Sequence, residues 1–207
     1  MNAINFMDNM DGVAATVVMI AAAAILAIIA VTGGEQWKVG ILYAMLIGAC
    51  GGFLVFNFPR ASVFMGDGGS LVIGLVLAYL IVRTTYYGRV EEVGWYGVLL
   101  PVIVLAVPLY DFLSVVAIRL AQGKNPMVGD EQHFGHRLRA SGLTDKQVWL
   151  IMSGATAVTG ISGIVLWHLD TWLAALIPVQ VALVIALVAV YEHGSSRTRR
   201  TDAPSDE

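Results

Sequence analysis

Six long apolar segments constrain the fold of this sequence more than any other feature. A helix needs about 20 apolar residues to cross the roughly 30 Å of hydrocarbon in a bilayer. Segments that approach this length lie at 13–32, 39–56, 70–82, 94–118, 148–167 and 171–191. The sequence therefore predicts an all-α, polytopic integral membrane protein with six transmembrane helices.

Two of these segments depart from the simple pattern. The segment 70–82 is short, and we expect it to extend to Tyr87, with the side chain of Arg83 reaching toward the interface. The segment 94–118 is long and contains Pro101, Pro108 and Asp111. A kink or a tilt is therefore expected in this fourth span.

The composition agrees with a membrane protein and excludes several other classes. Only 13% of the residues are charged, whereas soluble domains have about 25%. The formal net charge of -3 provides no basic face, so nucleic-acid binding is excluded as a main role. The single cysteine, Cys50, excludes a disulfide framework and a cysteine-based zinc or iron–sulfur site.

The distribution of lysine and arginine predicts the orientation in the membrane. An even number of spans places both termini on one side. That side carries nine of the 12 cations, namely Arg60, Arg119, Lys124, Arg137, Arg139, Lys146, Arg197, Arg199 and Arg200. Cytoplasmic loops are enriched in such residues, so both termini are predicted to be cytoplasmic. Residues 1–12 lack Lys and Arg and are not expected to be a signal peptide, whereas residues 194–207 are predicted to form a disordered tail.

Polar residues recur every three positions before the first span. They are Asn2, Asn5, Asp8 and Asp11. A straight α-helix would rotate this pattern by about 60° per step, so the four side chains converge only if the helix tightens or breaks near Gly12. Two interpretations remain open, a solvated segment that caps the first span and a polar ligand pocket.

A glycine-rich loop leads from Asn57 into the third span. Residues 57–70 read NFPRASVFMGDGGS, and glycines before a helix permit close backbone approach to an anion such as phosphate. Asp67 in this loop is either the N-cap of the span or part of a ligand site. A carboxylate beside phosphate requires a cation between them, so the second interpretation implies Mg²⁺ at Asp67.

The longest loop, residues 119–147, carries five cations and two histidines. If the loop is helical, Asp130, His133, His136 and Arg137 share one face. This pattern permits a zinc site, a solvated amphipathic helix, or a surface for an anionic partner, either substrate phosphate or lipid headgroups. The loop is expected to lie in water and to contribute little to helix packing.

Three motifs in this order resemble those of the polyprenyl-phosphate N-acetylhexosamine-1-phosphate transferases, glycosyltransferase family 4, which includes phospho-N-acetylmuramoyl-pentapeptide transferase. Residues 2–12 (NAINFMDNMDG) are similar to the family segment NAxNxxDxxDG, and residues 63–70 (VFMGDGGS) to VFMGDxGS. Residues 130–138 (DEQHFGHRL) resemble the loop DxxHxHHRL, in the form typical of the N-acetylglucosamine branch.

The resemblance implies a Mg²⁺-dependent phosphoglycosyl transferase of the bacterial inner membrane, with its domain at residues 1–193. Undecaprenyl phosphate would attack the β-phosphorus of a UDP-N-acetylhexosamine, such as UDP-N-acetylglucosamine, and expel UMP to start a lipid-linked glycan. Asp67 would bind Mg²⁺, and His133 and His136 would face the diphosphate. The residues expected to bind substrate are Asn2, Asn5, Asp8, Asp11, Asn57 and Arg137.

The sequence departs from the family at two points. Gly135 replaces a histidine of the family triplet, and no adjacent Asp pair matches the family's Asp-Asp-x-x-Asp/Asn motif. The family also has about ten or eleven spans, so the chain resembles its carboxyl-terminal part. A non-catalytic half that binds nucleotide sugar, or that needs a homodimer or a complementing amino-terminal half, is therefore an alternative. A small transporter that uses Asp67 and Asp111 as an ion path is another.

Overall fold

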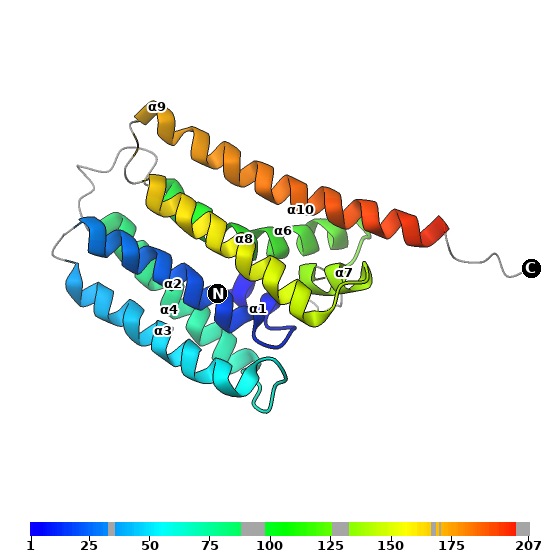
Figure 1. Ribbon diagram of the computed structural model, residues 1–207, viewed down its shortest axis with the longest axis horizontal. Helices are drawn as coiled ribbons and strands as arrows, with labels where there is room; N and C mark the ends of the chain where they lie inside the picture. Colours follow the sequence, from blue (N-terminus) through cyan, green and yellow to red (C-terminus); the bar gives the residue numbers. More distant parts are fainter. Residues whose placement is uncertain (33–35, 88–97, 126–132, 167–168, 170, 202–207) are drawn as a thin grey trace, which may run out of the picture.

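The protein is described by a computed structural model, in which residues 1–32, 36–87, 98–125, 133–166, 169 and 171–201 are described. Most of the described residues lie in helices (Figure 1). The helices are α1 (Asn2–Met7), α2 (Val13–Thr32), α3 (Trp37–Asn57), α4 (Gly66–Tyr87), α5 (Leu100–Val104), α6 (Ala106–Ala121), α7 (Phe134–Ala140), α8 (Asp145–Leu166), α9 (Thr171–Ala174) and α10 (Leu176–Thr201).

Five helices are long and apolar enough to cross a membrane, which confirms an all-α, polytopic membrane protein. The candidate spans are Val13–Val31, Trp37–Asn57, Gly66–Tyr86, Asp145–Leu166 and Trp172–Val190. α2 has the bounds that the first apolar segment predicts. α4 extends to Tyr87, as expected for the short third segment. The predicted count of six is therefore approximate, because the fourth segment is not one continuous helix.

The fourth segment breaks at Leu105, between α5 and α6. Pro108 has no amide hydrogen, so it cannot bond to the carbonyl of Val104 as an α-helix requires. The helical hydrogen-bond pattern resumes after the break, where the amide of Leu109 donates to the carbonyl of Leu105 with an N···O distance of 2.9 Å. The fourth segment, for which a kink or a tilt is predicted, is thus interrupted, and Pro108 gives a physical reason for the interruption.

The last helix is longer than the apolar segment that predicts it. α10 runs to Thr201 and so includes residues 194–201, which the sequence assigned to a tail. Backbone hydrogen bonds of a helix are local, so a helix does not have to end where the hydrocarbon ends. Residues 202–207 lie outside the described residues.

α2 lies at the centre of the bundle and packs against α3 and α8. Its small alanines let these neighbours approach, and Val17, Ala21 and Ile25 are fully buried. Figure 1 shows the long helices side by side, with α1, α7 and the loop between α3 and α4 near the same end. The three polar segments of the sequence therefore meet at one end of the bundle.

The short helix α1 is inserted between two longer helices, α4 and α6. Its close approach to α4 depends on Gly74, because a Cβ there would lie 3.1 Å from the Cα of Met1 and 3.2 Å from the Cβ of Ile4. Ile4 and Met7, which are three residues apart in α1, are both buried. α1 is thus fixed in place by packing, although it is too short to be stable alone.

Candidate functional site

The polar side of α1 contacts the first turns of α4. The amide nitrogen of Asn5 donates to Oδ1 of Asp67 at 3.0 Å and to Oγ of Ser70 at 2.9 Å. Ser70 is fully buried, and its own hydroxyl donates to the carbonyl of Gly66 at 3.1 Å, which leaves its oxygen free to accept from Asn5. Asn5 therefore orients the exposed carboxylate of Asp67, which lies in the first turn of α4 and not at its N-cap.

A second carboxyl group, that of Asp8, lies beside this contact at the end of α1. Burial of the carboxyl, and after it the negative charge of Asp67, raise the pKa of Asp8 from 3.8 to about 6. Two acids from separate motifs thus share one electrostatic environment. Such a pair favours either a proton or a cation between its members.

The loops that flank these acids are held together by Asn57 and Asp11. The buried Asn57 accepts the amide hydrogen of Gly12 at 2.6 Å and donates to the carbonyl of Val63 at 2.8 Å. Asp11 accepts the amide hydrogen of Ala61 at 3.0 Å. Asn57 and Asp11 therefore tie the α1–α2 loop to the α3–α4 loop.

The chain turns sharply at Gly12, which has φ +75. This left-handed conformation strains other residue types, and a Cβ at Gly12 would lie 2.8 Å from Cδ2 of Phe58. The polar segment therefore does break near Gly12, as its spacing required. Because the break follows Asp8, Asn5 and Asp8 face α4 while Asp11 reaches the next loop.

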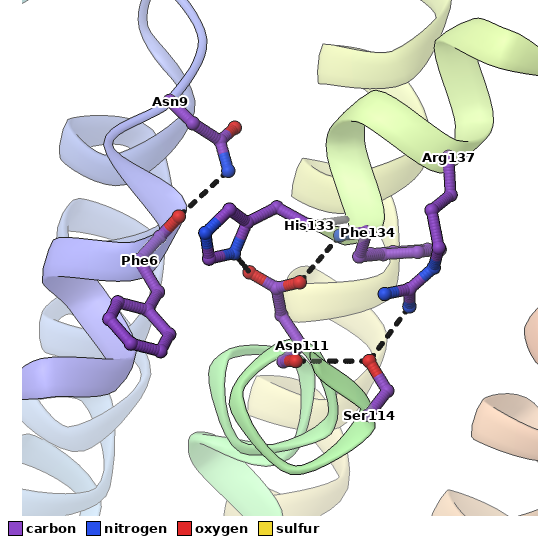
Figure 2. A network of polar contacts seen from close by, with 7 residues as sticks. All are labelled: Phe6, Asn9, Asp111, Ser114, His133, Phe134 and Arg137. Carbon is purple, nitrogen blue, oxygen red and sulfur yellow. Dashed lines mark hydrogen bonds and ion pairs between the residues drawn. The ribbon is translucent and has the colours of Figure 1, made fainter. Parts of the chain in front are cut away.

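On the other side of α1 the structure assembles a buried network around Asp111 (Figure 2). Oδ1 of Asp111 accepts the amide hydrogen of Phe134 at 2.6 Å, and Oδ2 lies 3.5 Å from Nδ1 of His133. The hydroxyl of Ser114 donates to the carbonyl of Asp111 at 2.9 Å and accepts from a terminal nitrogen of Arg137 at 2.7 Å. Asp111 is one of the two carboxylates on which the transporter alternative depends. The network gives this buried carboxylate partners within the protein.

The position of His133 corrects two predictions. His133 is the extended N-cap residue of α7, with φ -68 and ψ 151, so it does not share a helical face with His136. The predicted shared face is wrong because α7 begins only where Asp111 binds the amide of Phe134. The loop is also not merely solvated, because His133, Phe134 and Leu138 are buried. Asp130 lies outside the described residues.

α1 contacts both the Asp67–Ser70 region of α4 and the network around Asp111. The ring of Phe6 packs edge-on against the imidazole of His133, with 5.0 Å between ring centroids, and 5.5 Å from the ring of Phe112. Phe6 directly follows Asn5, which contacts Asp67. Asn9 closes the end of α1 by donating to the carbonyl of Phe6 at 2.7 Å. The acids of α1 and α4 and the histidine before α7 are therefore held by adjacent residues of one short helix.

Gly135, where the family carries a histidine, packs directly on the α1–α2 loop. A Cβ at this position would lie 2.7 Å from Sδ of Met10 and 3.3 Å from Oδ1 of Asn9. The side chain of Met10 therefore occupies the space that a larger residue at 135 would need. This contact gives a physical reason for the departure from the family triplet.

The remaining candidates are less constrained. Asn2 and His136 are half-buried, and the side chain of neither makes a hydrogen bond to another residue in the described ranges. Arg137 lies over the ring of Phe134, with its guanidinium carbon 6.0 Å from the ring centroid, and donates to Ser114. The structure thus brings together Asn5, Asp8 and Asp67, and separately His133 with Asp111, while Asn2 and His136 stand at the edges.

The chemistry of the acid pair fits Mg²⁺. This ion is commonly held by one or two carboxylates, with water and substrate phosphates completing its shell. Asp67 is exposed and oriented, and the raised pKa of Asp8 reports uncompensated negative charge and burial. Over the ranges that the structure describes, three or more His, Cys, Asp or Glu side chains do not gather into a metal-binding group. Two carboxylates that leave room for water and phosphate match the oxygen donors that Mg²⁺ takes.

Sequence reasoning did not identify Ser70 as a partner of Asn5 or Asp111 as a partner of His133. Ser70 follows Asp67 by three residues, which is one helical turn, so a helix beginning at Gly66 would have pointed to it. Asp111 is a carboxylate in an apolar segment, and such residues are functional candidates by default. Phe134, whose amide binds Asp111, is 23 positions away in the sequence, and no local pattern identifies a contact at that separation.

Comparisons with known proteins add to this geometry. A family model described as "Glycosyl transferase family 4" matches residues 1–85, which include the acids of α1 and α4. The chain is 33% identical over 188 residues to the "Probable undecaprenyl-phosphate N-acetylglucosaminyl 1-phosphate transferase" of Bacillus subtilis (strain 168), covering 91% of this chain and 51% of that relative.

Two further relatives show the same pattern of coverage. The "Decaprenyl-phosphate N-acetylglucosaminephosphotransferase" of Mycobacterium tuberculosis (strain ATCC 25618 / H37Rv) is 34% identical over 212 residues, covering 93% of this chain and 52% of the relative. The "Undecaprenyl-phosphate alpha-N-acetylglucosaminyl 1-phosphate transferase" of Escherichia coli (strain K12) is 28% identical, with 93% and 51% covered. The chain spans about half the length of the curated relatives it matches.

Proposed function

Because this chain belongs to glycosyl transferase family 4, we propose that it forms the part of a membrane phosphosugar transferase that binds the sugar nucleotide and a divalent cation. In the proposed reaction, a phosphate oxygen of undecaprenyl phosphate attacks the β-phosphorus of UDP-N-acetylglucosamine. The bond from that phosphorus to the UMP oxygen breaks as the new phosphorus–oxygen bond forms. The products are UMP and a lipid-linked sugar pyrophosphate that starts a cell-envelope glycan.

The observation that supports this proposal most is the contact of Asn5 with Asp67, with Asp8 beside it. The two segments are 62 positions apart in the sequence, yet the fold joins their polar residues at one end of a membrane bundle. A helix-packing role does not require an exposed carboxylate held by a neighbouring amide. A site for a cation and a phosphate does.

Each residue has a role that follows from its geometry. Asp67 and Asp8 would hold Mg²⁺, which supplies positive charge against the phosphoryl oxygens of the sugar nucleotide. Asn5 fixes the orientation of Asp67. Asn57 and Asp11 tie the α1–α2 loop to the α3–α4 loop. Preorganised groups of this kind reduce the reorganisation needed when charge shifts during phosphoryl transfer.

The residues around α7 supply the second part of the site. We propose that His133, His136 and Arg137 act on the diphosphate and so offset its negative charge. Their chemistry suits an anion, because imidazole and guanidinium groups donate hydrogen bonds to phosphate oxygens. Asn2 lies on α1 with Asn5 and is proposed to bind the nucleotide.

The transferase activity is proposed for this chain together with the sequence that matches the other half of its relatives. This follows from the coverage of 51–52% of those relatives. A specific alternative is that this chain binds nucleotide sugar and gains turnover only with a complementing amino-terminal half or within a homodimer. Both versions place the site on the cytoplasmic face of the bacterial inner membrane, with both termini inside.

The proposal is tested by assaying membranes that contain the chain, alone and together with the first half of the Bacillus subtilis relative. The assay measures UMP release from UDP-N-acetylglucosamine with undecaprenyl phosphate, before and after EDTA and with Mg²⁺ restored. We expect Mg²⁺-dependent release, and we expect D67N to lower the rate by about 100-fold or more, since it removes charge stabilisation that exists only with the ligand bound.

The matched control is D145N, which makes the same chemical change at an exposed carboxylate paired with Arg139 at 3.2 Å. This variant should keep the full rate. Retention of the rate by D67N would remove the metal assignment. Binding of UDP-N-acetylglucosamine by the chain without release in either preparation would favour the non-catalytic alternative.

A further inference from the structure

The buried carboxylate of Asp111 has no part in the proposed chemistry, yet it is the centre of the network in Figure 2. Asp111 lies in α6 within an apolar bundle, and its side chain is fully buried. A carboxylate in such a place is costly unless it is paired. Its two oxygens reach two consecutive residues, the amide of Phe134 and the ring of His133.

The proton on the imidazole can be assigned from this geometry. Oδ2 of Asp111 and Nδ1 of His133 are buried and lie 3.5 Å apart as an ion pair, and neither atom makes a hydrogen bond within the described part of the chain. If Nδ1 carried a lone pair, that lone pair would face those of the carboxylate oxygen at this distance. The arrangement is favourable only with a hydrogen on Nδ1 directed at Asp111.

The same carboxylate fixes the backbone that carries the ring. Phe134 provides the first amide of α7, and the N-cap residue His133 makes no side-chain capping bond. Oδ1 of Asp111 takes that amide hydrogen at 2.6 Å in place of a local cap. The ring of Phe6 packs on the imidazole from α1, so His133 is held from two sides.

We propose that Asp111 is the positioning residue of this site: it accepts the hydrogen on Nδ1 of His133 and so leaves Nε2 as the ring nitrogen for the substrate phosphates. Nε2 donates to a phosphate oxygen only when it carries a hydrogen as well, so the ring that bonds to both groups is the imidazolium. Figure 2 shows the second ring nitrogen on the side away from Asp111, toward the segment that carries Phe6 and Asn9. The position of the ring follows from the contacts, whereas the phosphate as the group at Nε2 rests on the proposed function. Carboxylates that accept the other ring hydrogen of a metal-bound histidine orient that histidine in the same way.

The first test reads the tautomer directly and needs no activity. Protein labelled with ¹⁵N-histidine is studied by nuclear magnetic resonance in detergent, and the signals of His133 are assigned by their loss in H133Q. We expect Nδ1 of His133 to carry a hydrogen in the wild type. In D111N the oxygen can still accept from Phe134, but the new amide presents hydrogens to Nδ1, so the hydrogen should move to Nε2. An unprotonated Nδ1 in the wild type, or no change in D111N, would overturn the proposal.

The second test separates positioning from a general structural role. In the transfer assay with the complementing half, D111N should lower the rate by about 10- to 100-fold, as loss of an orienting partner does elsewhere. In an H133Q background the same change should add less than about twofold, because residues that act through one another are not additive. An equal loss in both backgrounds would show that Asp111 acts through something other than His133.

Two controls keep the tests distinct. D145N should leave both the His133 signals and the rate unchanged, and size-exclusion elution in detergent should be the same for D111N and wild type. A wild type with the expected tautomer but without transfer would contradict the proposed function and leave the assignment of Asp111 supported by the spectra. A wild type with transfer but with the hydrogen on Nε2 would contradict the positioning role alone.

Discussion

At the scale of single residues, Asp8 carries the clearest electrostatic signature of the site. Its carboxyl is half-buried at the end of α1, and burial followed by the charge of Asp67 raises its pKa to about 6. Proteins tolerate such unfavourable charge placement mostly at functional sites. In the absence of a cation, the folded protein therefore binds a proton at Asp8 more tightly than the unfolded chain does.

This difference predicts a pH-dependent stability. Because the pKa of Asp8 is higher in the folded state (about 6) than in the unfolded state (about 3.8), its stabilising contribution is complete below about 3.8 and is lost as pH rises through about 6. We expect the Tm of the metal-free wild type, relative to D8N, to fall over this interval. The measurement is thermal unfolding in detergent with EDTA between pH 4 and 8.

Mg²⁺ should reverse this loss, because it favours the ionised carboxyl. Addition of Mg²⁺ at pH 7 is expected to raise the Tm of the wild type more than that of D8N, whereas D145N should respond as the wild type does. A Tm difference between wild type and D8N that does not vary with pH would contradict the electrostatic assignment of Asp8.

The sequence identifies some residues of the site and not others, for a physical reason. Asn5, Asp8 and Asp67 stand out because polar side chains beside an apolar helix need an explanation. The hydrogen bond between Gly12 and Asn57 spans 45 positions in the sequence, and the hydrogen bond between Phe134 and Asp111 spans 23. Such contacts depend on how helices pack, which the local spacing of residues does not encode.

At the scale of helices, small residues decide how closely α2 and α8 pack. A Cβ at Gly160 would lie 3.0 Å from the Cβ of Ala24, which is a short fixed side chain that cannot turn away. Within the same helix, Gly154 is exposed and has nothing within 4 Å of its Cβ position. Small residues at such interfaces let membrane helices approach closely.

The two glycines provide a matched pair of substitutions. G160L should destabilise the protein by about 3 kcal/mol, because a large side chain forces α2 and α8 apart. G154L should be neutral or stabilising by roughly 0.5 kcal/mol, since leucine is a better helix former than glycine and would face lipid. The measurement is the free energy of unfolding in mixed micelles, and equal destabilisation by both substitutions would contradict the packing of α2 on α8.

Helix positions follow from the sequence where the membrane alone determines them. The bounds of α2 match the apolar segment, because length and hydropathy are sufficient for a central span. The break at Leu105 was expected only as a kink, since the effect of Pro108 on two short helices depends on their neighbours. The start of α7 after His133 was missed, because a carboxylate from another helix sets it.

At the scale of the whole molecule, the structure places the polar loops and α1 at one end of the bundle (Figure 1). The same end carries the excess of lysine and arginine that predicts a cytoplasmic location. The proposed site for a sugar nucleotide must face the compartment that contains this substrate, so the orientation of the protein bears on its proposed function.

The orientation can be measured with single cysteines. In a C50A background, S62C on the loop between α3 and α4 should react with a membrane-impermeant maleimide only in inside-out vesicles. K38C at the opposite end of α3 should react only in right-side-out vesicles, and both positions are exposed in the structure. Labelling of S62C from the outside would reverse the orientation and place the acids of α1 and α4 on the wrong side for the proposed substrate.

The placement of α1 also has a consequence for the order of events during biosynthesis. α1 precedes its packing partners α4 and α6 along the chain, and a helix of six residues does not persist alone. Asn5 can meet Asp67, and Phe6 can meet His133, only after those helices are inserted. Partly synthesised chains therefore lack the candidate site, which assembles only once α4, α6 and His133 are in place.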